Sequence, residues 1–227
     1  AQGSFAELSV AREDKLAKKP SNLSFEEAAV VGVSGLTAQG ALDAGALQAG
    51  ERVLIIGASG GVGSLAVQQA KALGAEVTGV CSTAKVEKVR ALGADRVIDY
   101  RQQDFADGTI RYDLILDIGG NTSLRRLRRA LNPTGTLVIV GGESKGNLTG
   151  GFGRSLRAPL ISLFVRQRLT MLVSKEHHSD LGPLTDLIDA GRLTPSIDST
   201  YPLDQAADAM RQLEAGTVRG KISITMP

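Results

Sequence analysis

The sequence predicts an α/β fold in which helices cover both faces of a doubly wound parallel sheet. Along most of the 227 residues, short apolar runs alternate with stretches of helical periodicity, which is typical of right-handed βαβ units. The best-defined unit is residues 53–73, where a strand, a glycine-rich turn and a helix follow one another. The segments Ala72–Glu76 and Ala91–Asp95 repeat one pattern, in which a helix ends at a glycine and a strand follows.

The glycine-rich turn is the strongest functional signal. Val53–Ile56 is apolar without alternation, as expected of a strand that is buried on both faces, and from Val62 the apolar residues follow a helical period. Between them, Gly57, Gly60 and Gly63 allow a tight turn and the close approach of a ligand. The first N–H groups of the helix and the positive end of its dipole would face one point, which favours phosphate. The spacing therefore predicts nucleotide binding.

Residue types exclude two other nucleotide-binding classes. A P-loop requires a lysine after its last glycine, but Ser64 follows Gly63. Short-chain reductases pair a catalytic tyrosine with a lysine four residues later. The residues at that offset from the three tyrosines at 100, 112 and 201 are Asp104, Leu116 and Gln205.

The composition narrows the partners and the compartment expected for this protein. The chain is 42% hydrophobic and 22% charged with a net charge of +2, so we expect neither nucleic acid nor a membrane as a partner. No apolar run approaches the roughly 20 residues of a membrane span. The single cysteine excludes an internal disulfide and fits a reducing compartment, which predicts a cytoplasmic protein.

The N-terminal stretch stands apart from the alternating pattern. Residues 3–10 are expected to form a strand, and no partner strand is predicted nearby. Segment 1–23 therefore reads as the tail of a domain whose earlier part is absent, with a natural N-terminal arm as the alternative. Ser24 and Glu27 then form a capping box that predicts the beginning of a helix.

The remaining elements continue the βα alternation. Besides the strand before the glycine turn, we expect strands at 76–80, 96–98, 112–117, 136–140, 169–173 and 221–225, with an extended segment at 195–201. Helices are expected at 24–31, 37–44, 84–92, 123–131, 155–168, 178–190 and 204–214, and a mobile glycine-rich segment at 146–153. The glycine turn, Asp117–Asn121 and Val140–Gly142 would all lie at the carboxyl edge of the sheet, where the ligand is expected.

The end of the second strand predicts which nucleotide is bound. NAD-binding folds usually carry an acid about 20 residues beyond the turn. Here Cys81, Ser82 and Thr83 provide no carboxylate, and Glu76 lies at the opposite end of the strand. Hydroxyls and the ammonium of Lys85 would bind a 2′-phosphate that an acid would repel. The pattern predicts NADP(H); the alternative is that Lys85 is a solvated residue in the first turn of a helix.

Six segments together match one known family. They are Gly3–Glu7, Gly35–Ala38, Gly57–Gly63, Val97–Tyr100, Gly135–Gly142 and Arg219–Lys221. By these segments the chain resembles the medium-chain dehydrogenase/reductase superfamily, in its zinc-independent, quinone-oxidoreductase-like branch. The resemblance extends from Gly3 to the end of the chain.

The resemblance implies a GroES-like catalytic β domain followed by a Rossmann domain, with the last helix and strand returning to the catalytic domain. On this basis, residues 1–23 are expected to be a remnant of the N-terminal catalytic domain. Residues 24–195 would form the NADP-binding Rossmann domain, and residues 196–227 the return to the catalytic domain. Most of the catalytic domain would then be missing.

The resemblance also implies a set of cofactor contacts. The residues expected to make them are Gly60, Gly61, Val62 and Gly63 at the pyrophosphate; Ser82, Lys85 and Tyr100 at the 2′-phosphate; Asn121 and Gly141 at the adenosine and nicotinamide ends; and Thr37 near the nicotinamide. No residue is assigned a catalytic role.

No metal site is expected. The zinc-dependent branch carries a cysteine ligand a few residues before the position of Thr37, and the matching residue here is Val33. Cys81 is expected to be a small buried residue. The adjacent His177 and His178 would diverge by about 100° on a helix and could not easily share a metal.

Two further segments have more than one interpretation. Arginines 125, 126, 128 and 129 could bind phosphate or nucleic acid, but the leucines between them and the lack of aromatic residues favour a solvated helix face. The apolar strand around Met171 could simply belong to the core. By resemblance it is an edge strand that pairs two subunits into a homodimer.

The expected function is hydride transfer from NADPH to a quinone, an enone or an aldehyde or ketone, without zinc, with the cofactor supplying the chemistry. One alternative is an isolated NADP(H)-binding module that is inactive without its missing catalytic domain. Another is a relative that binds NADPH without turnover.

Overall fold

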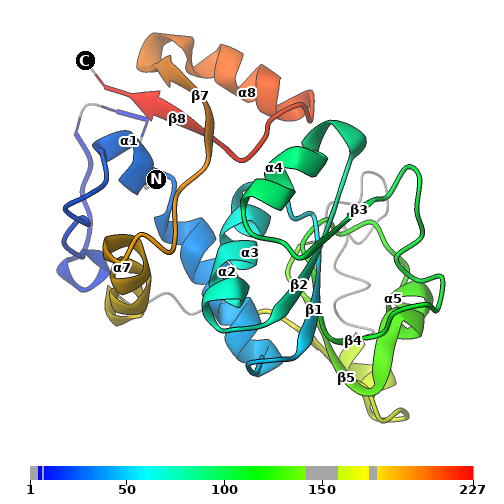
Figure 1. The fold of residues 1–227 in the computed structure, drawn as a ribbon. Coiled ribbons are helices and arrows are strands. Elements are labelled where there is room, and N and C mark those ends of the chain that lie inside the picture. The colour runs from blue at the N-terminus through cyan, green and yellow to red at the C-terminus, as the bar shows by residue number, and fades with distance from the viewer. Residues whose placement is uncertain (1–4, 7, 142–157, 174–177, 227) are drawn as a thin grey trace.

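The computed structural model describes residues 5–6, 8–141, 158–173 and 178–226. Its centre is a six-stranded parallel sheet in the order β3-β2-β1-β4-β5-β6 (Figure 1). The strands are β1 Arg52–Ile56, β2 Glu76–Cys81, β3 Arg96–Asp99, β4 Tyr112–Asp117, β5 Leu131–Ile139 and β6 Arg168–Met171. The reversal of strand order beside β1 confirms the doubly wound Rossmann prediction.

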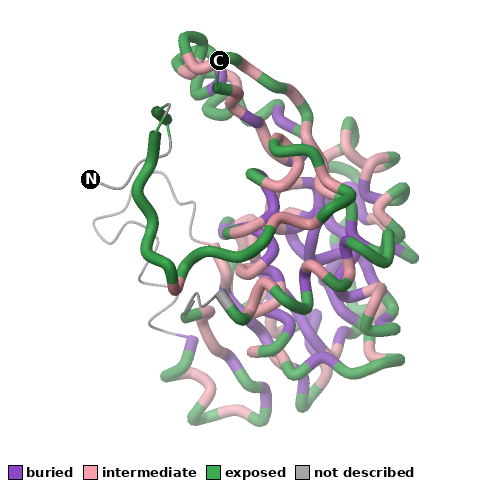
Figure 2. The backbone as a smooth tube through the Cα atoms, turned by 90° about the vertical axis from the view of Figure 1, so that its left-hand side faces the viewer, coloured by how far each residue is buried: buried purple, intermediate pink, exposed green. Residues whose placement is uncertain are grey.

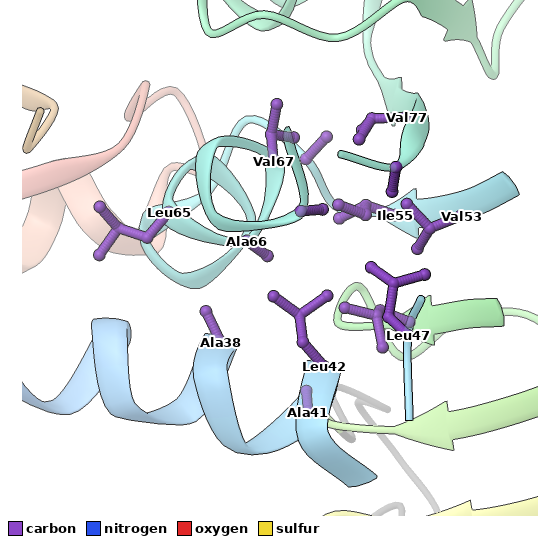
Figure 3. Packing of buried hydrophobic residues seen from close by; sticks show 14 of the residues in the cluster. Ala38, Ala41, Leu42, Leu47, Val53, Ile55, Leu65, Ala66, Val67 and Val77 are labelled. Atoms are coloured by element: carbon purple, nitrogen blue, oxygen red, sulfur yellow. The ribbon is translucent and has the colours of Figure 1, made fainter. Parts of the chain in front are cut away.

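Helices cover both faces of this sheet (Figure 1). On one face lie α2 Gly32–Gly45, α3 Gly61–Ala72, α4 Val86–Ala91 and α7 Leu181–Asp189; on the other lies α5 Leu124–Ala130. Burial on both faces explains why the sequence of strand β1 does not alternate in polarity. Val53 and Ile55 pack against α2 and α3 (Figure 3), whereas Leu54 belongs to the core on the α5 side. Every side chain of the strand after Arg52 is therefore buried.

A smaller parallel sheet follows at the C-terminus. It pairs β7 Ile197–Pro202 with β8 Lys221–Thr225, and α8 Ala206–Glu214 connects the two strands (Figure 1). The first strand of this sheet begins beside the boundary expected at residue 196. The division into domains remains a prediction.

The helix termini follow the signals in the sequence. Ser24 caps α1 Phe25–Ala29 in a capping box, because its hydroxyl accepts the N–H of Glu27 and the carboxylate of Glu27 accepts the N–H of Ser24. Gly74 has a φ of 82°, as expected of a left-handed residue after α3. No helix in the described ranges is long and apolar enough to span a bilayer.

The expected N-terminal strand is wrong where the structure describes it. Residues 5–6 and 8–12 form no strand, and the short 3₁₀ helix Glu13–Lys15 is the first regular element in the described part of the chain. Figure 2 shows the described residues near the N-terminus mostly as exposed. Leu8 and Val10 are 90% and 91% exposed. A strand needs a neighbour for its backbone hydrogen bonds, and no described segment pairs with this one.

The helix expected at 155–168 is shorter in the described residues. Residues 158–162 are helical, and the chain then turns before β6 begins at Arg168. In the helix expected at 178–190, a 3₁₀ turn at His178–Asp180 precedes α7. Residue 142 and the glycine-rich segment 146–153 lie outside the described residues, as does His177.

Candidate functional site

The turn between β1 and α3 has the geometry of an anion site. Gly57 has a φ of 90°, and its carbonyl accepts the N–H of Gly60 at 3.1 Å. A Cβ on Gly63 would lie 2.1 Å from the Gly57 carbonyl oxygen, so only glycine fits. Gly60 is the N-cap residue and offers no side-chain cap. The first N–H groups of α3, from Gly61 to Gly63, are therefore available to a ligand phosphate.

A cleft of about 470 Å³ opens beside this turn, at the carboxyl ends of β1, β2, β3 and β4. Its lining includes Gly57 and Ser59 of the turn. It also brings together four of the sequence-predicted residues, Ser82, Lys85, Tyr100 and Asn121. These residues come from three separate loops, and the parallel register of the strands places the loops at one edge of the sheet.

Lys85 is held by the C-terminal segment. Its ammonium donates to the carbonyl oxygen of Val218 at 2.6 Å and to that of Gly216 at 3.4 Å. The side chain is half-buried, so it is not a solvated helix residue. It lies on the cleft wall next to Gly216 and connects the cleft to the C-terminal segment.

Two arginines in the cleft are not among the cofactor contacts predicted from the sequence. Arg101 follows Tyr100 directly, and Arg126 lies on α5. The guanidinium of Arg126 donates to Asp104 at 2.8 Å and lies 4.8 Å from the centre of the Phe105 ring. The side chain of Arg126 is nonetheless 42% exposed, so the solvated-face interpretation holds for it in part. It holds fully for Arg125 and Arg129, which are exposed.

The comparisons with known proteins agree with this geometry. A family model described as zinc-binding dehydrogenase matches residues 92–224, more than half of the chain. The chain belongs to the zinc-binding dehydrogenase family. This finding and the relatives below confirm the resemblance to the medium-chain dehydrogenase/reductase superfamily and its quinone-oxidoreductase-like branch.

Named relatives cover nearly all of the chain. The NAD(P)H oxidoreductase RTN4IP1, mitochondrial, of Mus musculus is 33% identical over 99% of the chain, and the match spans 62% of that relative. Quinone oxidoreductase of Homo sapiens is 29% identical over 95% of the chain and 67% of the relative. A structure described as NAD-dependent alcohol dehydrogenase has a TM-score of 0.82 at 30% identity, over 99% of the chain and 66% of that structure. The chain thus spans less than two thirds of RTN4IP1.

The family description names zinc, and the described residues offer no group of three or more histidine, cysteine or acidic side chains that could hold a metal ion. Val33, which stands at the position of the expected cysteine ligand, is 65% exposed. Cys81 is buried at the end of β2, as the sequence predicts, and burial raises the pKa of its thiol to about 11. Such a thiol stays protonated at neutral pH.

No carboxylate is among the described residues that line the cleft of this family member, although Asp104 pairs with Arg126 at its wall. Glu76 is the first residue of β2, at the opposite edge of the sheet. Asp99 ends β3 and is buried, and hydrogen bonds from Thr83 and from the N–H of Arg101 help to lower the pKa of its carboxyl group. Among the described residues, the cleft lining contains Lys85, Arg101 and Arg126 but no Asp or Glu.

Six of the predicted cofactor residues do not line this cleft. Four of them, Gly60, Gly61, Val62 and Gly63, belong to the glycine turn beside it, and the other two are Thr37 and Gly141. Thr37 is half-buried on α2, and its hydroxyl donates to the carbonyl oxygen of Val33 at 2.7 Å. Gly141 follows β5, and its N–H donates to the carbonyl oxygen of Asp117 at 3.2 Å. The contacts of Thr37 and Gly141 with the cofactor remain predictions.

Proposed function

We propose that this chain binds NADP(H) and that the whole protein transfers a hydride from NADPH to a quinone, an enone or an aldehyde or ketone. The observation that carries the proposal is the cleft beside the glycine turn, whose described lining residues include three cations and no carboxylate. A 2′-phosphate carries nearly two negative charges and would be attracted there, whereas an acid in the same place would favour a ribose hydroxyl.

The contacts that we propose follow the geometry. Gly60, Gly61, Val62 and Gly63 would hold the pyrophosphate at the beginning of α3. Ser82, Lys85 and Tyr100, together with Arg101 and Arg126, would surround the 2′-phosphate and the adenosine. Asn121 lines the cleft as well. Thr37 and Gly141 would lie toward the nicotinamide. The bound cofactor would supply the hydride, and these residues would orient it.

A calorimetric titration of the chain with NADPH and NADH tests the proposal. One additional charge-assisted hydrogen bond is worth about 1.5–3 kcal/mol, so NADPH is expected to bind about tenfold to 100-fold more tightly than NADH. Adenosine 2′-phosphate is expected to compete with NADPH. Equal or tighter binding of NADH would contradict the proposed NADP(H) specificity. Failure of both dinucleotides to bind would contradict the proposed cofactor site.

A second candidate function is a cofactor-binding module without turnover of its own. It is favoured by the absence, among the described cleft residues, of a histidine or carboxylate that could act as a general acid or base. In this proposal, residues 1–23 and 196–227 belong with a catalytic domain outside this chain, and residues 24–195 form the cofactor domain. Consumption of NADPH with a quinone or enone by the whole protein, compared with this chain, distinguishes the two functions.

We also propose a homodimer formed through β6. Strand β6 is the last strand of the sheet, and Leu163 and Phe164, shortly before it, are 78% and 87% exposed. The N–H of Leu172 donates to the carbonyl oxygen of Ile139 on β5. The N–H of the preceding residue, Met171, therefore faces the outer edge of the sheet. Met171→Pro removes this outward donor while the bonds to β5 remain.

In light scattering, the wild-type chain is expected to show twice the mass of one chain, and Met171→Pro the mass of one. The unfolding temperature, extrapolated to low protein concentration, serves as the control for an intact fold. A wild-type monomer, or a variant that remains dimeric, would contradict the pairing through β6.

The location of the protein is likewise a proposal. The single cysteine is buried and free, which fits a reducing compartment, and we propose the cytoplasm. The similar mouse protein is named mitochondrial. Fractionation of the source cells distinguishes the two compartments.

A further inference from the structure

A second cavity, of about 490 Å³, lies beside α5 and shares no described lining residue with the cofactor cleft. Helix α5 covers the sheet face opposite α2 and α3 (Figure 1). Five of the eight described residues that line the cavity are arginines, and none of the eight is an aspartate or a glutamate. The arginines are Arg111, Arg125, Arg128, Arg129 and Arg166. The cavity thus gathers five positive charges in a chain whose net charge is only +2.

The arginines come from three separate segments of the chain. Arg111 directly precedes β4, and Arg166 lies shortly before β6. Because both strands belong to one parallel sheet, their amino ends lie at the edge opposite the cofactor cleft. The other three arginines belong to α5, and Arg125 lies in the first turn of this helix, where a cation interacts unfavourably with the helix dipole. The stability of α5 therefore does not explain Arg125.

Hydrogen bonds to neutral groups hold two of these arginines at the cavity. Nε of Arg128 donates to Oε1 of Gln167 at 3.0 Å, and the amide of Gln167 donates to the carbonyl oxygen of Arg128 at 2.9 Å. Gln167 is buried, so this reciprocal pair fixes the guanidinium in place. Arg111 donates to the carbonyl oxygen of Leu131 at 3.3 Å. A guanidinium has five N–H donors, so both arginines keep donors for a ligand.

Acidic side chains in the described part of the chain compensate little of this charge. Arg129 lies 3.4 Å from Asp104, whose carboxylate also pairs with Arg126 of the cofactor cleft at 2.8 Å. No side-chain hydrogen bond or ion pair of Arg125 or Arg166 is found in the described ranges. Like charges that converge on one cavity repel each other. Guanidinium groups match phosphate oxygens in bidentate geometry, and an anionic ligand would relieve the repulsion.

We propose that this cavity binds a small ligand with two or more linked phosphoryl groups, such as a nucleoside diphosphate, apart from the dinucleotide site. Cations on three segments favour several anionic groups over one. The described lining contains no aromatic side chain on which a base could stack, so the phosphates would supply the affinity. A cavity of this size lies within the range of small-molecule sites. The proposal does not depend on the proposed function.

The test is calorimetric titration of the chain with inorganic tripolyphosphate and orthophosphate at physiological salt, with and without NADPH. The wild-type chain is expected to bind one tripolyphosphate, and orthophosphate about tenfold more weakly or less. The double variant Arg125→Gln/Arg166→Gln removes two exposed charges. It is expected to lose about tenfold or more in affinity for tripolyphosphate. Its affinity for NADPH should stay unchanged, because neither residue lines the cofactor cleft.

The matched control is Arg52→Gln/Arg96→Gln. These two arginines are also exposed and begin β1 and β3 at the same edge of the sheet, but they do not line the cavity. The control is expected to retain the wild-type affinity for tripolyphosphate.

Several results would overturn the proposal. No binding of tripolyphosphate, several molecules bound per chain, or an equal loss in both double variants would leave only a diffuse attraction of charges. Displacement of tripolyphosphate by NADPH would place it in the cofactor cleft. Equal affinity for orthophosphate would contradict the requirement for linked phosphoryl groups. Tighter binding of a single-stranded RNA than of tripolyphosphate would assign the arginines to nucleic acid.

Discussion

Lys85→Ala is expected to abolish the preference of the chain for NADPH over NADH. The ammonium lies on the wall of a cleft that contains three cations, and a charge-assisted bond to the 2′-phosphate is worth about 1.5–3 kcal/mol. The affinity for NADPH should therefore fall by about 10- to 100-fold. The affinity for NADH, which lacks this phosphate, should change little. Calorimetric titration of both nucleotides measures the two changes separately.

A control is needed because Lys85 also bonds to the carbonyl oxygens of Gly216 and Val218. Lys88→Ala removes a comparable bond, to the carbonyl oxygen of Arg219, from a residue that does not line the cleft. If Lys88→Ala loses as much NADPH affinity as Lys85→Ala, the effect arises from loosening of residues 216–219. If Lys85→Ala retains its preference for NADPH, the 2′-phosphate is bound elsewhere.

Gly63→Ala is expected to destabilise the fold and to remove nucleotide binding. The added Cβ would meet the carbonyl oxygen of Gly57 at 2.1 Å and the Cα of Ala58 at 2.8 Å. Both atoms belong to the backbone of the turn, so the clash cannot be relieved by rotating a side chain. A cost of about 2–3 kcal/mol follows from overpacking of this kind, which lowers the unfolding temperature by roughly 5–10 °C in a chain of this size.

Gly60→Ala is the matched control in the same turn. A Cβ there would lie 3.5 Å from the nearest atom, the carbonyl oxygen of Gly57, which is an ordinary contact. Gly60 also has an extended backbone, with a φ of −82°, that alanine adopts without strain. The two variants should therefore have clearly different unfolding temperatures. Equal unfolding temperatures would show that the turn does not require glycine at position 63.

The sequence predicted most of the sheet because its signals are local. Each parallel strand is a short apolar run buried on both faces, and each helix carries its own period and its own cap. Ser24 with Glu27 and the glycine at 74 are examples whose predicted roles the structure confirms. The absence of an acid at the end of β2 could likewise be read from three consecutive residues, without knowledge of the fold.

Predictions failed where an element depends on a partner outside its own segment. Residues 3–10 have strand-like composition, but a strand forms only when another strand completes its backbone hydrogen bonds. The place of Arg126 in the cleft could not be predicted, because nothing in the sequence indicates that Phe105 and Asp104 fold beneath it.

The sequence by itself thus determined the Rossmann sheet, the glycine turn and the residue types of the candidate nucleotide site. Only the tertiary structure decided how that site is completed. It places Lys85 against the carbonyl groups of the C-terminal segment. It also gathers five arginines from separate segments around a second cavity. The physical reason is that periodicity and caps depend on neighbours within a few positions. The environment of a charge depends on whichever segments the folded chain packs around it.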